Sequence, residues 1–330
     1  MVNIALVGSG HIAKLHAETL RSIEGARIVS VYDVDFHRAA ALAGAVGAHA
    51  YTDLDACMKQ ADLVYILTPP SFHRDIAVAA MEDGKHVMIE KPISISLRDA
   101  EDICETAARL NRKAMVGFNM RFRYGYGLLK SMIDGGRLGE PMTYWSHRMG
   151  YVGGDGTWRT NASLMSGFTI ESISHDIDMF RWLSGSEVDR VYGHTANSRA
   201  DLPGYDDNCA ALLRLANGQT ASIQASWSSY LEYNDRGVTG SDGTARIGGS
   251  GTWNFDTFAY RTRGEAAETV ERFDDRLTAE AYVGLNAHAI DCVKNGTTPL
   301  VSAEDGYRAL RVCHAILQSH REGRPVSLHE

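Results

Sequence analysis

The chain has 330 residues, which suits two domains better than one average hydrophobic core. Its 44% hydrophobic content is ordinary for a globular protein, and its net charge of −8 argues against a nucleic-acid partner. No apolar run reaches the length of a bilayer span, and no secretory leader is recognisable, so neither a membrane nor export is expected. Five scattered cysteines without a Cys-x-x-Cys pair predict reduced thiols in a cytoplasmic protein.

Strand and helix signals alternate over residues 3–118. Short, nearly continuous apolar runs separated by helical stretches favour a parallel sheet covered on both faces, that is, a doubly wound Rossmann domain. The predicted strands are residues 4–7, 28–32, 63–67, 86–89 and 114–118. The predicted helices between them are residues 11–21, 36–46, 71–82 and 97–110.

The pattern changes after residue 118. A helix over residues 121–133 is followed by longer segments rich in Thr, Ser, Tyr and Trp, which predict a mainly antiparallel sheet. Its expected strands are residues 142–149, 188–194, 209–215 and 219–227, with a hairpin turn at Asn217-Gly218. Helices are expected at residues 170–183, 279–294 and 303–320, the last opened by Ser302 and Asp305 as a capping box. Residues 230–275 are glycine-rich and are predicted to be irregular.

A glycine motif, Gly8-x-Gly10-x-x-Ala13, lies between the first strand and the first helix. Gly8 permits a tight turn, Gly10 lets the backbone approach a pyrophosphate, and the helix N-terminus favours the phosphates. Asp33 ends the second strand, where a carboxylate accepts hydrogen bonds from the ribose hydroxyls and repels a 2′-phosphate. The motif therefore predicts NAD rather than NADP, although Arg38 nearby could accommodate a phosphate. The alternative is a glycine turn without a ligand.

The fourth strand ends in Thr68-Pro69-Pro70-Ser71-Phe72-His73. Ligands of open α/β sheets bind outside the carboxyl ends of the strands, so this segment is expected to face the cofactor. The prolines could equally serve only to start the next helix, and His73 could be a surface residue.

Glu90-Lys91-Pro92 ends the fifth strand, beside the expected nicotinamide position. A lysine there can hold a substrate hydroxyl and pass on its proton. The alternative is an ordinary surface lysine. The residues expected to contact the dinucleotide are Gly8, Ser9, Gly10, His11, Ile12, Asp33, Thr68, Pro69, Pro70, His73, Glu90 and Lys91.

A second group of polar residues, Glu171, His175 and Asp178, has the spacing i, i+4 and i+7, which is one face of a helix. A carboxylate one turn from an imidazole can orient it and raise its basicity, as a proton shuttle requires. The alternatives are an exposed ion pair, a core histidine, or a zinc site. No third ligand cluster is evident in the sequence, so no metal is expected.

Taken together, these motifs resemble the Gfo/Idh/MocA oxidoreductases, the relatives of glucose–fructose oxidoreductase and inositol 2-dehydrogenase. The segments that carry the resemblance are Gly8 to Gly10 with Asp33, Thr68 to His73, Glu90-Lys91-Pro92, Gly117-Phe-Asn119-Met-Arg121-Phe, and Glu171-x3-His175-x2-Asp178. The resemblance spans nearly the whole chain.

The resemblance implies two domains: a Rossmann domain over residues 1–120, and an α+β domain with an open, mainly antiparallel sheet over residues 121–330. A C-terminal helix could return to the first domain. Homodimers or homotetramers through the second sheet are expected. Lys91 matches the catalytic lysine of the family and His175 its histidine acid/base, whereas Glu171 stands where many members have Asp.

Substrate contacts are implied for Lys91, Asn119, Arg121, Trp158, Arg159, Glu171 and His175. The resemblance thus predicts an NAD-dependent dehydrogenase that oxidises a ring alcohol of a sugar, cyclitol or related polyol. The alternatives are an enzyme that cleaves glycosides through transient oxidation by NAD, a non-catalytic NAD-binding regulator, and a carbonyl reductase on the same scaffold.

Overall fold

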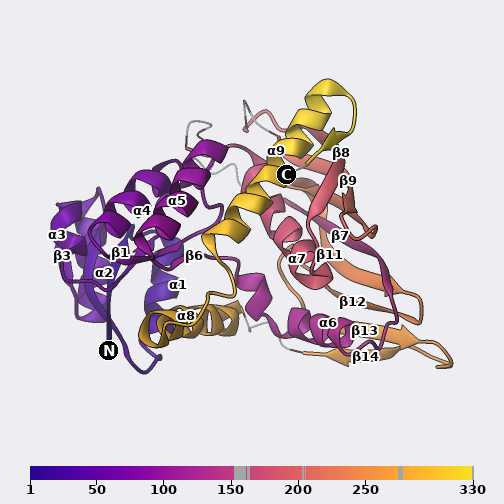
Figure 1. Cartoon of the computed structure of the whole chain (residues 1–330), viewed down its shortest axis with the longest axis horizontal. Helices are drawn as coiled ribbons and strands as arrows, with labels where there is room; N and C mark the ends of the chain where they lie inside the picture. Colours follow the sequence, from indigo (N-terminus) through magenta and orange to yellow (C-terminus); the bar gives the residue numbers. More distant parts are fainter. Residues whose placement is uncertain (152–160, 162–163, 203, 205, 274–277, 329–330) are drawn as a thin grey trace. The chain divides into compact units, whose positions relative to one another are not determined.

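A computed structural model describes residues 1–151, 161, 164–202, 204, 206–273 and 278–328 (Figure 1). The chain forms two compact units. The first joins Met1–Asn119 with Ala279–Leu310, and the second joins Met120–Thr278 with Arg311–Glu330. The first unit therefore takes part of its structure from a late segment of the chain.

The first unit contains a six-stranded sheet in the order β3-β2-β1-β4-β5-β6, with every neighbouring pair parallel. This confirms the predicted doubly wound sheet. Its strands are β1 (Val2–Val7), β2 (Ala26–Tyr32), β3 (His49–Tyr51), β4 (Leu63–Ile66), β5 (His86–Ile89) and β6 (Ala114–Val116). Its helices are α1 (His11–Leu20), α2 (Phe36–Val46), α3 (Leu54–Met58), α4 (His73–Glu82), α5 (Leu97–Leu110), α8 (Thr278–Asn295) and the start of α9 (Ala303–Glu322).

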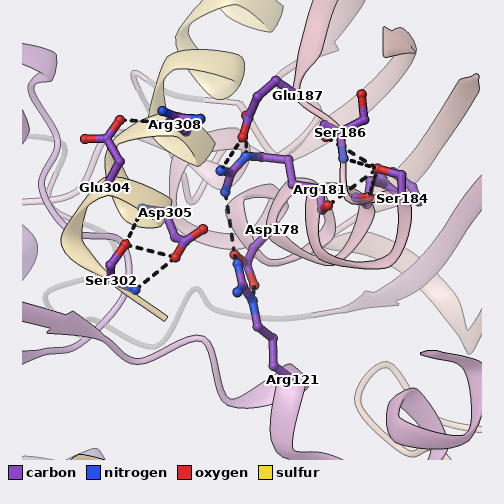
Figure 2. Close-up of polar contacts among 11 residues, drawn as sticks. Arg121, Asp178, Arg181, Ser184, Ser186, Glu187, Ser302, Glu304, Asp305 and Arg308 are labelled. Carbon is purple, nitrogen blue, oxygen red and sulfur yellow. Dashed lines mark hydrogen bonds and ion pairs between the residues drawn. The ribbon is translucent and has the colours of Figure 1, made fainter. Parts of the chain in front are cut away.

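The order of the strands distributes the helices over the two faces of this sheet. The chain moves from β1 to β2 in one direction and from β4 to β5 in the other, so right-handed crossovers place α1 and α4 on opposite faces. Helix α1 contacts α2, and α4 contacts α5, as expected for a layer of helices on each side (Figure 1). The predicted capping box also forms, because the Asp305 N–H donates to Ser302 Oγ and the Ser302 N–H donates to Asp305 Oδ2 (Figure 2).

The second unit contains a nine-stranded sheet in the order β14-β13-β12-β11-β7-β10-β9-β8-β15. All neighbouring pairs are antiparallel except β7 and β10, which run parallel. Its strands are β7 (Pro141–Tyr151), β8 (Val188–Ala196), β9 (Asn208–Leu215), β10 (Thr220–Ser226), β11 (Ser228–Gly240), β12 (Gly243–Gly249), β13 (Thr257–Thr262), β14 (Thr269–Arg272) and β15 (Val326–Ser327). The mainly antiparallel sheet and the Asn217-Gly218 hairpin were both predicted correctly.

Helices cover one face of this second sheet. The aromatic ring of Tyr144 on β7 contacts Phe180 of α7 (Ser174–Ser184), and Ile316 of α9 lies against Gly193 of β8. The other face carries exposed apolar side chains, including Tyr192, which is 49% exposed, and Leu212, which is 63% exposed. The sheet therefore has one buried and one open face.

The prediction that residues 230–275 are irregular was wrong, because this segment contributes to β11 and forms β12, β13 and β14. Glycine residues in this segment made its strands hard to recognise in the sequence. At Gly237 on β11, a Cβ atom would lie 2.5 Å from the ring of Trp145 on β7, so the absence of a side chain there reflects close packing between strands. None of the helices in the described part of the chain combines the length and the apolar character needed to cross a membrane.

A buried charge cluster joins α7 to the second sheet. Asp176 on α7 accepts hydrogen bonds from Arg148 on β7 (3.1 Å), from Arg236 on β11 (3.0 Å) and from the Ser146 hydroxyl (2.6 Å). Burial raises the pKa of Asp176, but the two guanidinium groups and the hydroxyl outweigh burial and hold that pKa below its usual range. Because all of these side chains are buried, loss of one partner would leave an uncompensated charge. The cluster therefore fixes the helix that carries His175.

Candidate functional site

The two glycines of the first turn have different physical roles. Gly8 has a φ of +103°, and a Cβ atom there would lie 2.7 Å from the Leu67 carbonyl oxygen, so the fold itself requires glycine. Gly10 has an ordinary φ of −69°, and a Cβ atom there would meet no atom of the chain within 4 Å. The space at Gly10 is therefore available to a ligand, which fits the close approach of a pyrophosphate.

The start of α1 fits an anion. The helix begins after Gly10, which has no side chain to cap it, so backbone N–H groups of the first turn remain available. Ser9, His11 and Ile12 surround this turn, with the His11 side chain exposed. The arrangement is the one expected for binding the phosphates of a dinucleotide.

Asp33 lies at the carboxyl end of β2, and its side chain is buried. Oδ2 accepts hydrogen bonds from the Ser9 N–H (2.9 Å) and hydroxyl (2.7 Å), and Oδ1 accepts from the Asp35 N–H (2.9 Å) and the Arg38 guanidinium (2.7 Å). Burial raises the pKa of Asp33, but these hydrogen bonds outweigh it and hold that pKa below its usual range. Asp33 is therefore ionised at neutral pH, and a ribose hydroxyl bound here would replace one of its present donors.

Two hydroxyl groups after β4 lack partners. Thr68 Oγ1 and Ser71 Oγ are both buried, and neither has a hydrogen-bond partner among the residues that the structure describes. Buried hydroxyls are normally hydrogen-bonded, so these two groups are available to a molecule bound at this end of the sheet. Pro69 and Pro70 hold the chain between them, and Pro70 begins a 3₁₀ turn (Pro70–Phe72).

His73 is a buried residue and not a surface one, since its side chain is only 1% exposed. Its Nε2 lies 2.9 Å from the Thr68 carbonyl oxygen, and its Nδ1 lies 3.0 Å from the Pro92 carbonyl oxygen. The imidazole thus ties the end of β4 to the segment after Lys91. Burial lowers the pKa of His73, and hydrogen bonds to the carbonyls only partly offset this effect.

Lys91 follows β5 and is half-buried, and the Lys91–Pro92 peptide bond is cis. The preceding Glu90 side chain is directed into the first unit, where Oε1 lies 3.0 Å from His16 Nε2 and Oε2 accepts the Lys91 N–H at 3.0 Å. The described contacts of Glu90 are thus with the protein interior. Its predicted contact with the cofactor stays a prediction.

Glu171 and His175 are both buried in the second unit, Glu171 being 5% and His175 6% exposed. Glu171 lies in a π-helical turn (Thr169–Ile173) immediately before α7, and π-helical turns are frequent at functional sites. The His175 ring lies 6.0 Å from that of Trp253, edge to face. Ile173 and Ile177, on another face of this helical segment, are buried as well, so protein surrounds it on more than one side.

Arg121 is held by Asp178, the third member of the predicted polar face. The contact is bidentate: Nε donates to Oδ2 at 2.9 Å and the terminal nitrogen donates to Oδ1 at 2.5 Å (Figure 2). Arg181 on the next turn binds Glu187 in the same manner (Figure 2). The guanidinium of Arg121 thereby anchors α7, and its predicted contact with substrate stays a prediction.

The remaining predicted substrate residues are less informative. Asn119 is buried in a 3₁₀ turn (Asn119–Phe122). Trp158 and Arg159 lie outside the described residues. Within the described part of the chain, no group of three or more His, Cys, Asp or Glu side chains could hold a metal ion.

Three contacts were not predicted from the sequence. Arg38 was named only as a group that could accommodate a phosphate, yet its guanidinium binds Asp33; its place five residues after the carboxylate was the available signal. Ser71 was named only as part of the segment from Thr68 to His73. Asn286, which lies 2.9 Å from His16, is 270 residues away in the sequence, and no local signal could have found it.

Comparison with known proteins identifies the family. Residues 2–118 match the model of an oxidoreductase family with an NAD-binding Rossmann fold, and residues 130–328 match the model of the C-terminal alpha/beta domain of the same family, Gfo/Idh/MocA. The chain belongs to this family. The Gfo/Idh/MocA assignment makes it an NAD-dependent oxidoreductase, and it confirms the fold class expected from the motifs.

The chain resembles characterised relatives over its full length. It is 30% identical to scyllo-inositol 2-dehydrogenase (NAD(+)) of Bacillus subtilis, over 99% of this chain and 96% of the relative. It is 27% identical to myo-inositol 2-dehydrogenase of Thermotoga maritima, over 100% and 99%. A crystal structure of a putative myo-inositol dehydrogenase from Sinorhizobium meliloti aligns with a TM-score of 0.83 at 27% identity, covering 100% of both chains.

The buried His73 predicts a pH dependence of stability. Its pKa in the folded protein lies below the unfolded value of 6.5, so the unfolded chain binds the proton more readily. This contribution to the unfolding free energy is complete above about pH 7.5 and is lost as the pH falls through 6.5. Between about pH 7.5 and about pH 5.5 it amounts to at most about 1.4 kcal/mol.

Urea unfolding of wild type and His73→Gln at both pH values measures this effect. We expect a smaller loss of unfolding free energy at low pH in the variant than in wild type. His37→Gln, which replaces an exposed histidine on α2, is the control and should keep the wild-type pH dependence. Equal losses in all three proteins would contradict the prediction.

Proposed function

We propose that this protein oxidises a ring hydroxyl of a cyclitol, a sugar or a related polyol, with NAD as the hydride acceptor. The observation that carries the proposal is the full-length similarity to enzymes named inositol 2-dehydrogenases. The ionised Asp33 at the end of β2 supports NAD over NADP, because a 2′-phosphate there would meet a carboxylate. Arg38 already neutralises part of that charge, so the preference is expected to be strong but not absolute.

For the cofactor, we propose the backbone around Gly8, Gly10 and α1 for the pyrophosphate, Asp33 for the ribose, and the Thr68 and Ser71 hydroxyls at the end of β4. Bound NAD supplies the electrophilic carbon that accepts the hydride. For the substrate, we propose Lys91 and His175, with Asn119, Arg121, Trp158 and Arg159 as further contacts carried over from the family resemblance.

The chemistry proposed for these side chains is proton transfer. Lys91 hydrogen-bonds the hydroxyl that is oxidised. The proton of this hydroxyl leaves through Lys91 and His175 as the carbon loses its hydride. Glu171, which stands where many members of the family have Asp, orients His175. The buried Asp176 cluster keeps the helix in place, which supports a fixed orientation of the imidazole.

The alternative functions differ in their products. A glycoside-cleaving enzyme would release free sugar without net NADH, and a regulator would bind NAD without turnover. Neither is favoured, because the relatives named above are dehydrogenases. We also infer a cytoplasmic location from the five cysteines, all of which are free in the structure.

Substitution of Lys91 tests the proposed chemistry. Lys91→Ala removes the group that accepts the hydroxyl proton, and general acid–base catalysis is worth about 10²- to 10⁴-fold. We expect kcat for polyol oxidation to fall by at least about 100-fold, while the Kd for NAD stays within about twofold.

NADH absorbance gives kcat, and titration of tryptophan fluorescence gives the Kd. The matched control is Lys85→Ala, just before the same strand. In the described contacts, the Lys85 ammonium binds the Lys59 carbonyl oxygen and the neighbouring Asp83. Unimpaired turnover of Lys91→Ala would refute the assignment.

We further propose that the open face of the second sheet binds a second copy of the chain. Tyr192 and Leu212 are directly paired across β8 and β9, and Leu212 is also paired with Ser222 on β10. A wide sheet face with exposed apolar side chains is typical of an interface between subunits.

Light scattering after gel filtration measures the oligomer. We expect wild type to be a dimer or tetramer and Leu212→Glu to be smaller, because a buried carboxylate would oppose association. The control is Leu300→Glu, at an exposed leucine of the first unit outside the sheet, which should keep the wild-type mass. A monomeric wild type, or a Leu212→Glu variant of unchanged mass, would contradict this proposal.

A further inference from the structure

A chain of buried polar side chains lies next to Lys91 in the first unit. His16 comes from α1, Glu90 from the end of β5, and Asn286 from α8. His16 and Asn286 are fully buried, and Glu90 is nearly so. Neither His16 nor Asn286 has a place in the proposed binding of NAD or substrate.

The hydrogen bonds run in one line toward Lys91. His16 Nδ1 lies 2.9 Å from Asn286 Oδ1, and His16 Nε2 lies 3.0 Å from Glu90 Oε1. The other oxygen of the same carboxylate accepts the backbone N–H of Lys91 at 3.0 Å. The imidazole therefore acts on Lys91 through Glu90.

The partners of Asn286 determine which of its atoms faces His16. Its Nδ2 donates to Thr19 Oγ1 at 2.7 Å, and the Thr19 hydroxyl in turn donates to carbonyl oxygens of its own helix. Its Oδ1 accepts the hydroxyl of Tyr65 at 3.1 Å. Burial raises the pKa of Tyr65, so this phenol stays a neutral donor. The atom facing His16 is thus the amide oxygen, Oδ1.

The other nitrogen of His16, Nε2, lies 3.0 Å from Glu90 Oε1. A hydrogen bond between an imidazole and a carboxylate is charge-assisted, and its geometry orients both groups.

The surroundings are built to hold this pair. The His16 ring contacts Tyr65 and Tyr282 edge to face, with ring centroids 5.2 Å and 5.1 Å away. A Cβ atom at Gly117 would lie 2.9 Å from Glu90 Oε1, so glycine leaves the space that the carboxylate occupies. In so closed an environment the Glu90 carboxylate would be costly to bury without hydrogen-bond partners, and His16 is one of them.

We propose that His16 and Asn286 are positioning residues for Lys91: Asn286 orients the His16 ring, and His16 holds the Glu90 carboxylate in place on the Lys91 N–H. Without His16, a buried carboxylate would lose its partner one residue from the lysine. Glu90 would then move from its place on the Lys91 N–H and misdirect the lysine. The proposal rests on the proposed function only in giving Lys91 a role in proton transfer.

The direct test follows the hydrogen bond from the Lys91 N–H to Glu90. In protein labelled with nitrogen-15, the amide proton shift of Lys91 responds to the geometry of this bond. We expect His16→Gln to move that shift. An unchanged Lys91 amide shift in His16→Gln would overturn the proposal.

The kinetic test separates positioning from general stability. His16→Gln keeps hydrogen-bonding atoms but replaces the rigid ring that joins Asn286 to Glu90 with a flexible side chain. We expect kcat to fall by about 10- to 100-fold, with the Kd for NAD unchanged and the protein folded.

The matched control is His86→Gln, at the opposite end of β5, where the imidazole accepts only the Lys113 N–H in the described contacts. It removes a comparable hydrogen bond and should leave kcat unchanged. Equal kcat in His16→Gln and His86→Gln would refute the positioning role. The two claims fail separately, because absence of any polyol oxidation would refute the proposed function while leaving the Lys91 amide shift measurable.

Discussion

The parallel register of three strands determines where the chemistry of the first unit lies. Val7 of β1 pairs with Ile66 of β4, which pairs with Ile89 of β5, so the three strands end level with one another. Each strand is followed directly by its polar segment: the glycine turn, the Thr68 segment, and Glu90 with Lys91. The contact that a Cβ at Gly8 would make with Leu67 shows how closely the first two segments approach. Chain segments far apart in sequence thus form one edge that can bind a dinucleotide.

Much of this edge was predictable from local patterns. Apolar runs of strand length, helices between them, and a glycine turn followed by an acid at the end of the second strand identify a Rossmann domain without long-range information. The same reasoning failed for residues 230–275. Gly237 there accommodates the ring of Trp145 from another strand, so its glycine signals a neighbour in space and not a loop. The parallel pairing of β7 with β10 likewise depends on contacts between distant segments.

The sequence was less informative about the surroundings of the predicted polar residues. The spacing of Glu171 and His175 predicted one polar face of a helix, but not that this face is buried. Arg148 and Arg236 reach α7 from two strands, and their charges offset the cost of burying Asp176 on the same helix. Ion pairs of this kind carry no sequence signal, because their members are distant in the chain.

In both units, buried side chains hold the segment that carries a residue proposed for catalysis. In the first unit, Asn286 contacts His16, and His16 contacts the Glu90 carboxylate that binds the Lys91 backbone. In the second, Arg121 and the Asp176 cluster hold the helix of His175. Both arrangements place the proposed residue on a rigid support, as precise orientation of a reacting hydroxyl would require.

The central claim is that this protein transfers a hydride from a ring alcohol to NAD. Its most direct test is to measure NADH formation across a panel of inositols, sugars and anhydrosugars, with the carbon product identified by NMR. We expect at least one compound of the panel to yield NADH together with an equal amount of a ring ketone or the corresponding lactone. Absence of NADH with every member, or release of free sugar from a glycoside without NADH, would contradict it.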